Sequence, residues 1–225
     1  MRNVLLLLTI FLTNISFAQN SLVPTFKMNG DATFSSNFTK YGISQSNKDP
    51  CLSGAFWYDW GPQLKAGFTG ESVGFQSSET HFLFKPNAEL DIYFTANAKL
   101  AIFLGQNLYF KSENRDGFFI NLKLNFFDYL VYIDNEANFM GTQTALNHFG
   151  FGSQTSVFGN WNWENVIGYA MVNTSSYSNF FHLKSSLQVK PSSILYQGGL
   201  TYNSAASQFN GMADPSIYVS ATVTF

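Results

Sequence analysis

The feature that most constrains the fold of this chain is its last ten residues, which alternate between apolar and polar side chains up to the carboxyl terminus. One face of an extended strand would carry Ile217, Val219, Ala221, Val223 and Phe225, and the other Ser216, Tyr218, Ser220, Thr222 and Thr224. Such a strand has one apolar and one polar side. It therefore belongs at a boundary between an apolar and a polar environment.

The composition indicates what this boundary is. Charged residues make up 12% of the chain and aromatic residues 18%, whereas an ordinary soluble domain has about 25% charged residues. The mean hydropathy is only -0.03, and no segment after the amino terminus offers the ~20 consecutive apolar residues of a membrane helix. These values suit a closed sheet with one face in lipid and the other around a polar interior.

The amino terminus has the pattern of a cleaved secretory signal. Residues 1–18 combine Arg2, an apolar run and the small-x-small site Ser16-Phe17-Ala18. We expect residues 19–30 to be a short periplasmic lead-in and 31–225 to form the barrel, located in the bacterial outer membrane. A net charge of -2 gives no reason to expect a nucleic-acid partner.

Turn signals divide the remaining chain into twelve predicted strands, with ten or fourteen as alternative counts. The predicted spans are 31–41, 51–60, 63–73, 81–94, 99–109, 117–125, 129–135, 146–157, 163–172, 180–189, 194–203 and 216–225. Alternation is weakest in 129–135 and 163–172. Short and long connections alternate along the chain, as periplasmic turns and external loops do in outer-membrane barrels. The fold prediction is an all-β, transmembrane, antiparallel up-and-down barrel of about 12 strands.

Two sets of side chains follow from this assignment. Charged and polar residues on the faces opposite the apolar ones would line the lumen, because facing lipid would be very unfavourable for them. This predicted set is Asp31, Asp59, Lys65, Glu71, Glu89, Asp91, Lys123, His182 and Lys184. The four tryptophans lie near predicted periplasmic turns and are expected to form an aromatic girdle at headgroup depth: Trp57, Trp60, Trp161 and Trp163.

One segment resembles a known family. Gly42-Ile43-Ser44-Gln45-Ser46, followed by Asp49-Pro50, is similar to the amino-terminal signature of the TorF-type porins, which are outer-membrane barrel proteins of similar length. The chain departs from that signature at Tyr41, where the family usually has arginine, and at Ala55, where it usually has a second glycine. The resemblance implies a barrel and a porin, and no particular substrate.

The same segment is predicted to be a structured first external loop, spanning Gly42 to Pro50. Gly42 permits positive φ, and Asp49-Pro50 favours a turn. The loop would serve either its own folding or surface recognition. At the other end of the chain, the terminal strand resembles those by which outer-membrane barrels are recognised by their assembly machinery, and Tyr218, Val223 and Phe225 are the expected signal residues.

Two functions fit this prediction. The first is a porin through which small hydrophilic solutes diffuse passively in a narrow polar lumen. The alternative is a non-conducting surface protein whose external loops bind a ligand or partner, and a third possibility is a soluble secreted β-sandwich. The expected partners of a barrel are the outer-membrane bilayer with its lipopolysaccharide, the barrel-assembly machinery and small solutes. The oligomeric state stays open.

Catalytic, cofactor and metal sites are not predicted. The three histidines, His81, His148 and His182, lie far apart in sequence and in no recognisable nucleophile motif. The acidic residues lack the spacing of a calcium loop. The prediction is therefore a protein that is not an enzyme and has no cofactor.

Overall fold

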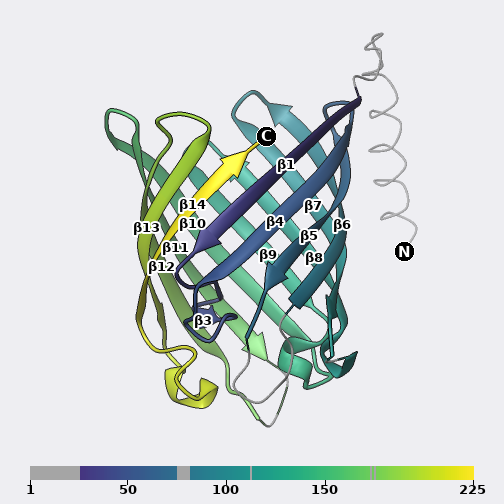
Figure 1. The fold of residues 1–225 in the computed structure, drawn as a ribbon, viewed down its shortest axis with the longest axis vertical. Helices are drawn as coiled ribbons and strands as arrows, with labels where there is room; N and C mark the ends of the chain where they lie inside the picture. Colours follow the sequence, from purple (N-terminus) through teal and green to yellow (C-terminus); the bar gives the residue numbers. More distant parts are fainter. Residues whose placement is uncertain (1–25, 75–81, 112, 173, 175) are drawn as a thin grey trace, which may run out of the picture.

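The computed structural model describes residues 26–74, 82–111, 113–172, 174 and 176–225, and shows an all-β protein (Figure 1). Within these residues, twelve strands form one closed antiparallel barrel. They are β1 (Phe26–Ser35), β4 (Cys51–Trp60), β5 (Leu64–Ser72), β6 (Phe82–Thr95), β7 (Ala98–Tyr109), β8 (Gly117–Phe126), β9 (Tyr129–Glu136), β10 (Leu146–Phe158), β11 (Trp161–Val172), β12 (Phe180–Val189), β13 (Ile194–Asn203) and β14 (Ser216–Thr224). The predicted barrel is confirmed, and the sandwich alternative is wrong. The predicted signal at 1–18 and His81 lie outside the described residues.

Smaller elements lie between these strands. A separate two-stranded sheet consists of β2 (Thr39–Lys40) and β3 (Ile43–Ser44). Short 3-10 helices occur as η2 (Glu113–Arg115), η3 (Phe139–Gly141) and η4 (Ala206–Phe209). None of the helices described is long and apolar enough to cross a membrane.

The barrel closes where its first strand meets its last. β1 pairs antiparallel with β14 on one side and with β4 on the other. The backbones of Gly30 and Phe225 exchange two hydrogen bonds of 2.9 Å. Because β1 begins at Phe26, residues 26–30 belong to the barrel and not to a lead-in. β1 also ends earlier than predicted, at Ser35.

The two faces of the sheet differ in chemistry. Along β14, Ile217 and Val219 are 82% and 60% exposed, whereas Tyr218 between them is only 6% exposed. In β8, Phe118 and Ile120 are likewise exposed. Because the sheet has no free edge, its backbone hydrogen-bonding groups are satisfied within the barrel. Together with the apolar outer face, this closure meets the conditions for a barrel that crosses lipid.

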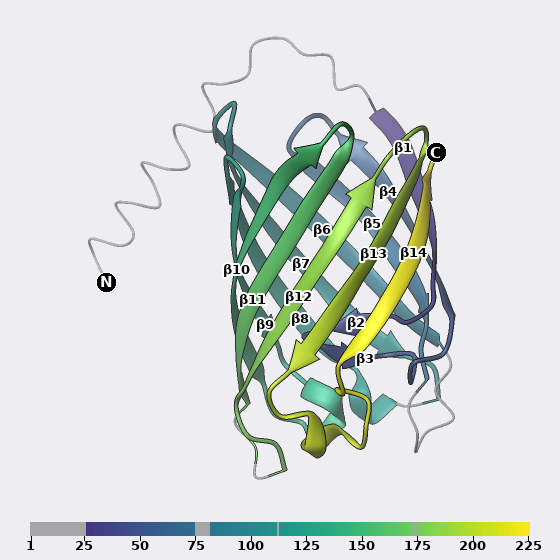
Figure 2. The same cartoon turned by 90° about the vertical axis from the view of Figure 1, so that its left-hand side faces the viewer.

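The two ends of the barrel differ in their connections. Short turns join β4 to β5, β6 to β7, β8 to β9, β10 to β11 and β12 to β13, at the end where the carboxyl terminus lies (Figure 1, top). Longer connections, which carry η2, η3 and η4, lie at the opposite end (Figures 1 and 2). The predicted alternation of short and long connections is confirmed.

A hydrophobic core lies at the end with the long connections. Its buried members are Ile43, Phe139, Leu146, Ala170, Val172, Phe180, Ala205, Phe209 and Ala213. Ala170 and Val172 lie on the inner face of β11, which packs against this core and not against water. The weak polar alternation of β11 follows from this, since both of its faces are apolar at this end.

Candidate functional site

The connection after β1 folds back into the barrel. Residues 36–46, which we call the inner hairpin, contain β2 and β3 and lie inside the barrel near its long-connection end (Figures 1 and 2). Gly42 to Ser46 are buried, and only Lys48 to Pro50 are exposed. The prediction of a structured external loop from Gly42 to Pro50 is therefore corrected, because most of this segment lies within the lumen.

Gly42 allows the inner hairpin to lie against the barrel wall. Its φ is +72°, a conformation that favours glycine. A Cβ atom here would lie 2.9 Å from the carbonyl oxygen of Tyr202 and 3.2 Å from Cβ of His182. Both the backbone angle and the close approach therefore require the absence of a side chain.

The next residues anchor the hairpin by packing and hydrogen bonding. Ile43 is fully buried in the hydrophobic core. The Ser44 hydroxyl donates to Oδ1 of Asn37 at 2.7 Å, and the Gln45 carbonyl accepts a 2.8 Å hydrogen bond from the Gly74 backbone. These groups satisfy one another within the barrel mouth, as buried polar groups must.

The end of the segment forms a tight turn into β4. The Ser46 hydroxyl donates to the Asp49 carbonyl at 2.7 Å, and the Asp49 backbone donates to the Ser46 carbonyl at 3.0 Å. Pro50 directly precedes β4. These contacts favour a loop-folding role for the motif over surface recognition through its buried part.

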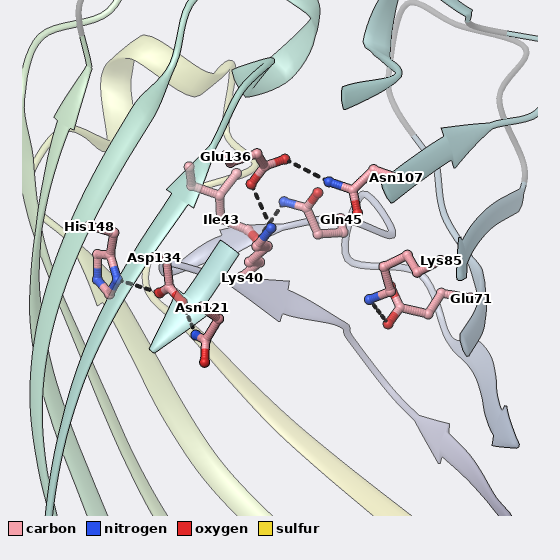
Figure 3. Close-up of polar contacts among 10 residues, drawn as sticks. All are labelled: Lys40, Ile43, Gln45, Glu71, Lys85, Asn107, Asn121, Asp134, Glu136 and His148. Carbon is pink, nitrogen blue, oxygen red and sulfur yellow. Dashed lines mark hydrogen bonds and ion pairs between the residues drawn. The ribbon is translucent and has the colours of Figure 1, made fainter. Parts of the chain in front are cut away.

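An ion pair holds the hairpin to the wall. Nζ of Lys40 lies 2.5 Å from Oε2 of Glu136, whose side chain is 7% exposed (Figure 3). The second Glu136 oxygen accepts from Nδ2 of Asn107 at 3.2 Å. Burial disfavours the charge of Lys40, but the negative charge of Glu136 and of more distant carboxylates outweighs it, so the pKa of Lys40 is raised above its ordinary value.

Two histidines on the barrel wall, His148 of β10 and His182 of β12, contact each other next to Tyr41 of the inner hairpin. Nε2 of His148 lies 2.6 Å from Nε2 of His182, and Nδ1 of His148 lies 2.8 Å from Oδ2 of Asp134 (Figure 3). The Tyr41 ring covers both imidazoles, with centroid distances of 4.5 Å to His148 and 6.0 Å to His182. We call Asp134, His148 and His182 the histidine cluster.

The hydrogen-bond pattern assigns the protons of this cluster. His148 donates through Nδ1 to the Asp134 carboxylate, so its Nε2 accepts from Nε2 of His182. Nδ1 of His182 is then an acceptor, and it has no hydrogen-bond partner among the described residues. Because both histidines are buried, we infer that the cluster is a structural support on which the Tyr41 ring packs. Sequence spacing could not reveal this contact, since the histidines are 34 positions apart.

All nine predicted lumen residues stand on the inner faces of their strands. This set is Asp31, Asp59, Lys65, Glu71, Glu89, Asp91, Lys123, His182 and Lys184. Lys65 contacts Glu89 at 3.0 Å and Asp91 at 3.1 Å. Lys85, which was not predicted, pairs with Glu71 (Figure 3). Many of the lumen charges therefore compensate one another.

Two cavities lie in the lumen next to the inner hairpin, each of about 360 Å³. One extends along β5 to β9 and the other along β8 to β13. They share Lys40, Tyr41, Asn121, Lys123 and Asp134 in their walls. The hairpin narrows the barrel, but space bounded by polar side chains remains beside it.

The tryptophans do not all face the same way. Trp60, Trp161 and Trp163 are 45%, 37% and 46% exposed on the outer face, near the short turns. Trp57 shares the inner face with Asp59, because positions two apart along a strand point to the same side. The prediction of a four-tryptophan girdle is therefore wrong for Trp57.

The predicted assembly residues occupy both faces of β14. Val223 and Phe225 are 40% and 70% exposed on the outside, and Tyr218 is buried on the inside. The Phe225 ring lies over Gly30, where a Cβ atom would come within 2.6 Å of it. An assembly role for these residues stays a prediction. Across the described residues, no group of three or more His, Cys, Asp or Glu side chains could hold a metal ion.

A closed twelve-strand antiparallel sheet with an apolar exterior and a charged lumen defines a barrel of the outer-membrane porin and channel fold. Solved structures share this fold. The NanC porin aligns with a TM-score of 0.57 and 9% identity over 88% of this chain and 99% of that one. The KdgM porin aligns with a TM-score of 0.56 and 6% identity over 88% of this chain and 98% of that one. The Acinetobacter baumannii outer membrane protein Omp33 aligns with a TM-score of 0.52 and 8% identity over 89% of this chain and 98% of that one. No protein-family model matches the chain, and no curated protein matches it.

Proposed function

We propose that the protein resides in the bacterial outer membrane and allows small hydrophilic solutes to diffuse through a lumen narrowed by the inner hairpin. The shared fold with porins supports this proposal, as does the resemblance of the Gly42–Pro50 segment to the TorF-type porins. The role is one of passage and not of catalysis.

The observation that carries the proposal is the pair of cavities beside the inner hairpin. The interior of an eight-stranded barrel is filled by its own side chains, and 16–18 strands leave an open channel. Twelve strands lie between these cases, and here the hairpin takes up part of the width while two polar cavities of about 360 Å³ remain. This arrangement suits a restricted passage for small solutes.

One observation favours the second candidate, a non-conducting surface protein. The hydrophobic core around Ile43, Phe139 and Phe209 lies at the barrel mouth, where it would block the lumen of a non-conducting barrel. A barrel closed in this way would act through its exposed connections, of which Lys48 to Pro50 form a part.

Membrane residence is tested by site-specific fluorescence quenching. Single cysteines replace Leu183 and Val219 on the outer face, or their inner-face neighbours Lys184 and Ser220, in a Cys51→Ser background. Labelled protein is reconstituted in bilayers that carry nitroxide groups on the acyl chains. The outer positions should be quenched and the inner ones should not. Equal quenching at all four sites would contradict membrane residence.

Conduction is tested with purified protein in planar bilayers, after heat-modifiable gel migration has shown that it is folded. The wild type should give small discrete steps, and a variant with residues 39–46 replaced by glycine and serine should give larger ones. The control replaces residues 190–193, in a short turn at the opposite end, and should conduct like the wild type. A folded protein that stays silent, with and without the inner hairpin, would favour the surface-protein alternative.

A further inference from the structure

The lysines that border the two cavities differ in whether they have a partner. Lys40 pairs with Glu136, Lys85 with Glu71, and Lys184 lies 3.6 Å from Glu164. Lys123 has no ion-pair or hydrogen-bond partner in the part of the chain that the structure describes. It is the cavity lysine whose charge is free to meet a solute.

No carboxylate stands directly opposite Lys123, and Asp134 lies diagonally across from it on β9. In the register of the sheet, Lys123 on β8 stands opposite Ala101 on β7 and Tyr132 on β9. The adjacent inner-face positions of β8 are Asn121 and Asn125, which are neutral. The side chain is partly exposed, and it lines both cavities. A solute in either cavity can therefore reach the ammonium group.

The other charged groups of the cavity walls have partners. Lys40 and Lys85 pair with Glu136 and Glu71, and the walls themselves contain two carboxylates, Asp134 and Glu164. The Asp134 carboxylate accepts hydrogen bonds from His148 and Asn121, and Glu164 pairs with Lys184 and accepts from Gln188. Among the described residues, Lys123 is thus the lysine of these walls that no carboxylate pairs with. An unpaired charge within low-dielectric walls attracts ions of the opposite sign.

We propose that Lys123 is an anion-binding subsite of the lumen and that the solutes it favours are small hydrophilic anions. The Tyr132 hydroxyl, in the wall of one of the cavities, can donate a hydrogen bond to such a solute. This inference deepens the proposed function and rests on it for transport. Binding at Lys123 can be measured separately from conduction.

The binding test is protection of amines from chemical modification. Folded protein in detergent is treated with an acetylating reagent, with and without citrate as the probe, and each lysine is quantified by mass spectrometry. Citrate should slow the acetylation of Lys123 by roughly threefold, which is the size of effect expected from the interaction energy of a partly exposed charge pair. Lys190, in a short turn, should not be protected. Equal Lys123 acetylation in both samples, or no acetylation at all, would overturn the proposal.

The transport test is the reversal potential in a potassium chloride gradient. Lys123→Gln should lower the chloride-to-potassium permeability ratio by roughly threefold, whereas Lys190→Gln removes the same charge elsewhere and should leave the ratio unchanged. If the channel conducts but Lys123→Gln has the wild-type ratio, the inference fails while the proposed function stands. If the protein never conducts but citrate protects Lys123, the subsite stands and the porin function fails.

Discussion

Nε2 of His148 and Nε2 of His182 lie 2.6 Å apart, and this contact is made in the space left by Gly168. A Cβ atom at position 168 would lie 2.2 Å from Nε2 of His182 and 2.3 Å from Nε2 of His148. Tyr41 of the inner hairpin rests on these imidazoles. The small residue in β11 is therefore linked, through the histidine cluster, to the seating of the hairpin.

The first prediction concerns this glycine. Gly168→Ala should separate the imidazoles, break a buried hydrogen bond at a cost of about 1–3 kcal/mol, and loosen Tyr41. The temperature of the heat-modifiable gel transition should fall, and conductance should rise. Gly198→Ala is the matched control, since the nearest atom to a new Cβ there is Cγ1 of Val219 at 3.8 Å. Identical behaviour of the two variants would argue against the link.

A second glycine pair separates backbone strain from close approach. Gly42 and Gly61 have nearly equal φ values, +72° and +68°, but a Cβ atom at position 61 meets nothing within 4 Å. Both alanine variants should bear a strain of about 1 kcal/mol. Only Gly42→Ala should also push the hairpin from the wall at Tyr202 and change the single-channel conductance. A change of the same size in Gly61→Ala would show that strain alone is responsible.

The third prediction uses the ion pair between Lys40 and Glu136. Lys40→Glu or Glu136→Lys alone places like charges together and should destabilise the hairpin by about 1–3 kcal/mol. The double exchange should restore the pair, so its conductance and gel transition should return toward those of the wild type. If the double variant is no better than the two single ones combined, the two side chains are not coupled.

The fourth prediction concerns pH. The pKa of Lys40 in the folded protein is raised above its ordinary value of 10.5, so the protonated form stabilises the folded state. This contribution is complete below the pKa of the unfolded chain and is lost as the pH rises through the higher folded-state pKa. Conductance of the wild type should hence show a step above pH 10.5 that Lys40→Met lacks. A step in both proteins would assign it to other groups.

The sequence predicted the strands well because alternation with a period of two is a local property. The exposed Ile217 and Val219 beside the buried Tyr218 show that a pattern within one strand is enough to assign its faces. The same rule, applied strictly, would have put Trp57 and Trp60 on opposite faces. The number of strands followed from counting turns, since each short connection carries its own signal.

The arrangement of the barrel interior depends on contacts across the ring. The path of the inner hairpin is set by walls far away in sequence: Glu136 for Lys40, and the hydrophobic core for Ile43. The meeting of His148 with His182 likewise needs the register of β10, β11 and β12. Local sequence fixes which side of a strand a residue occupies. Closure of the sheet determines which residues then share the interior, and so which charges are paired there and which, such as Lys123, are not paired among the described residues.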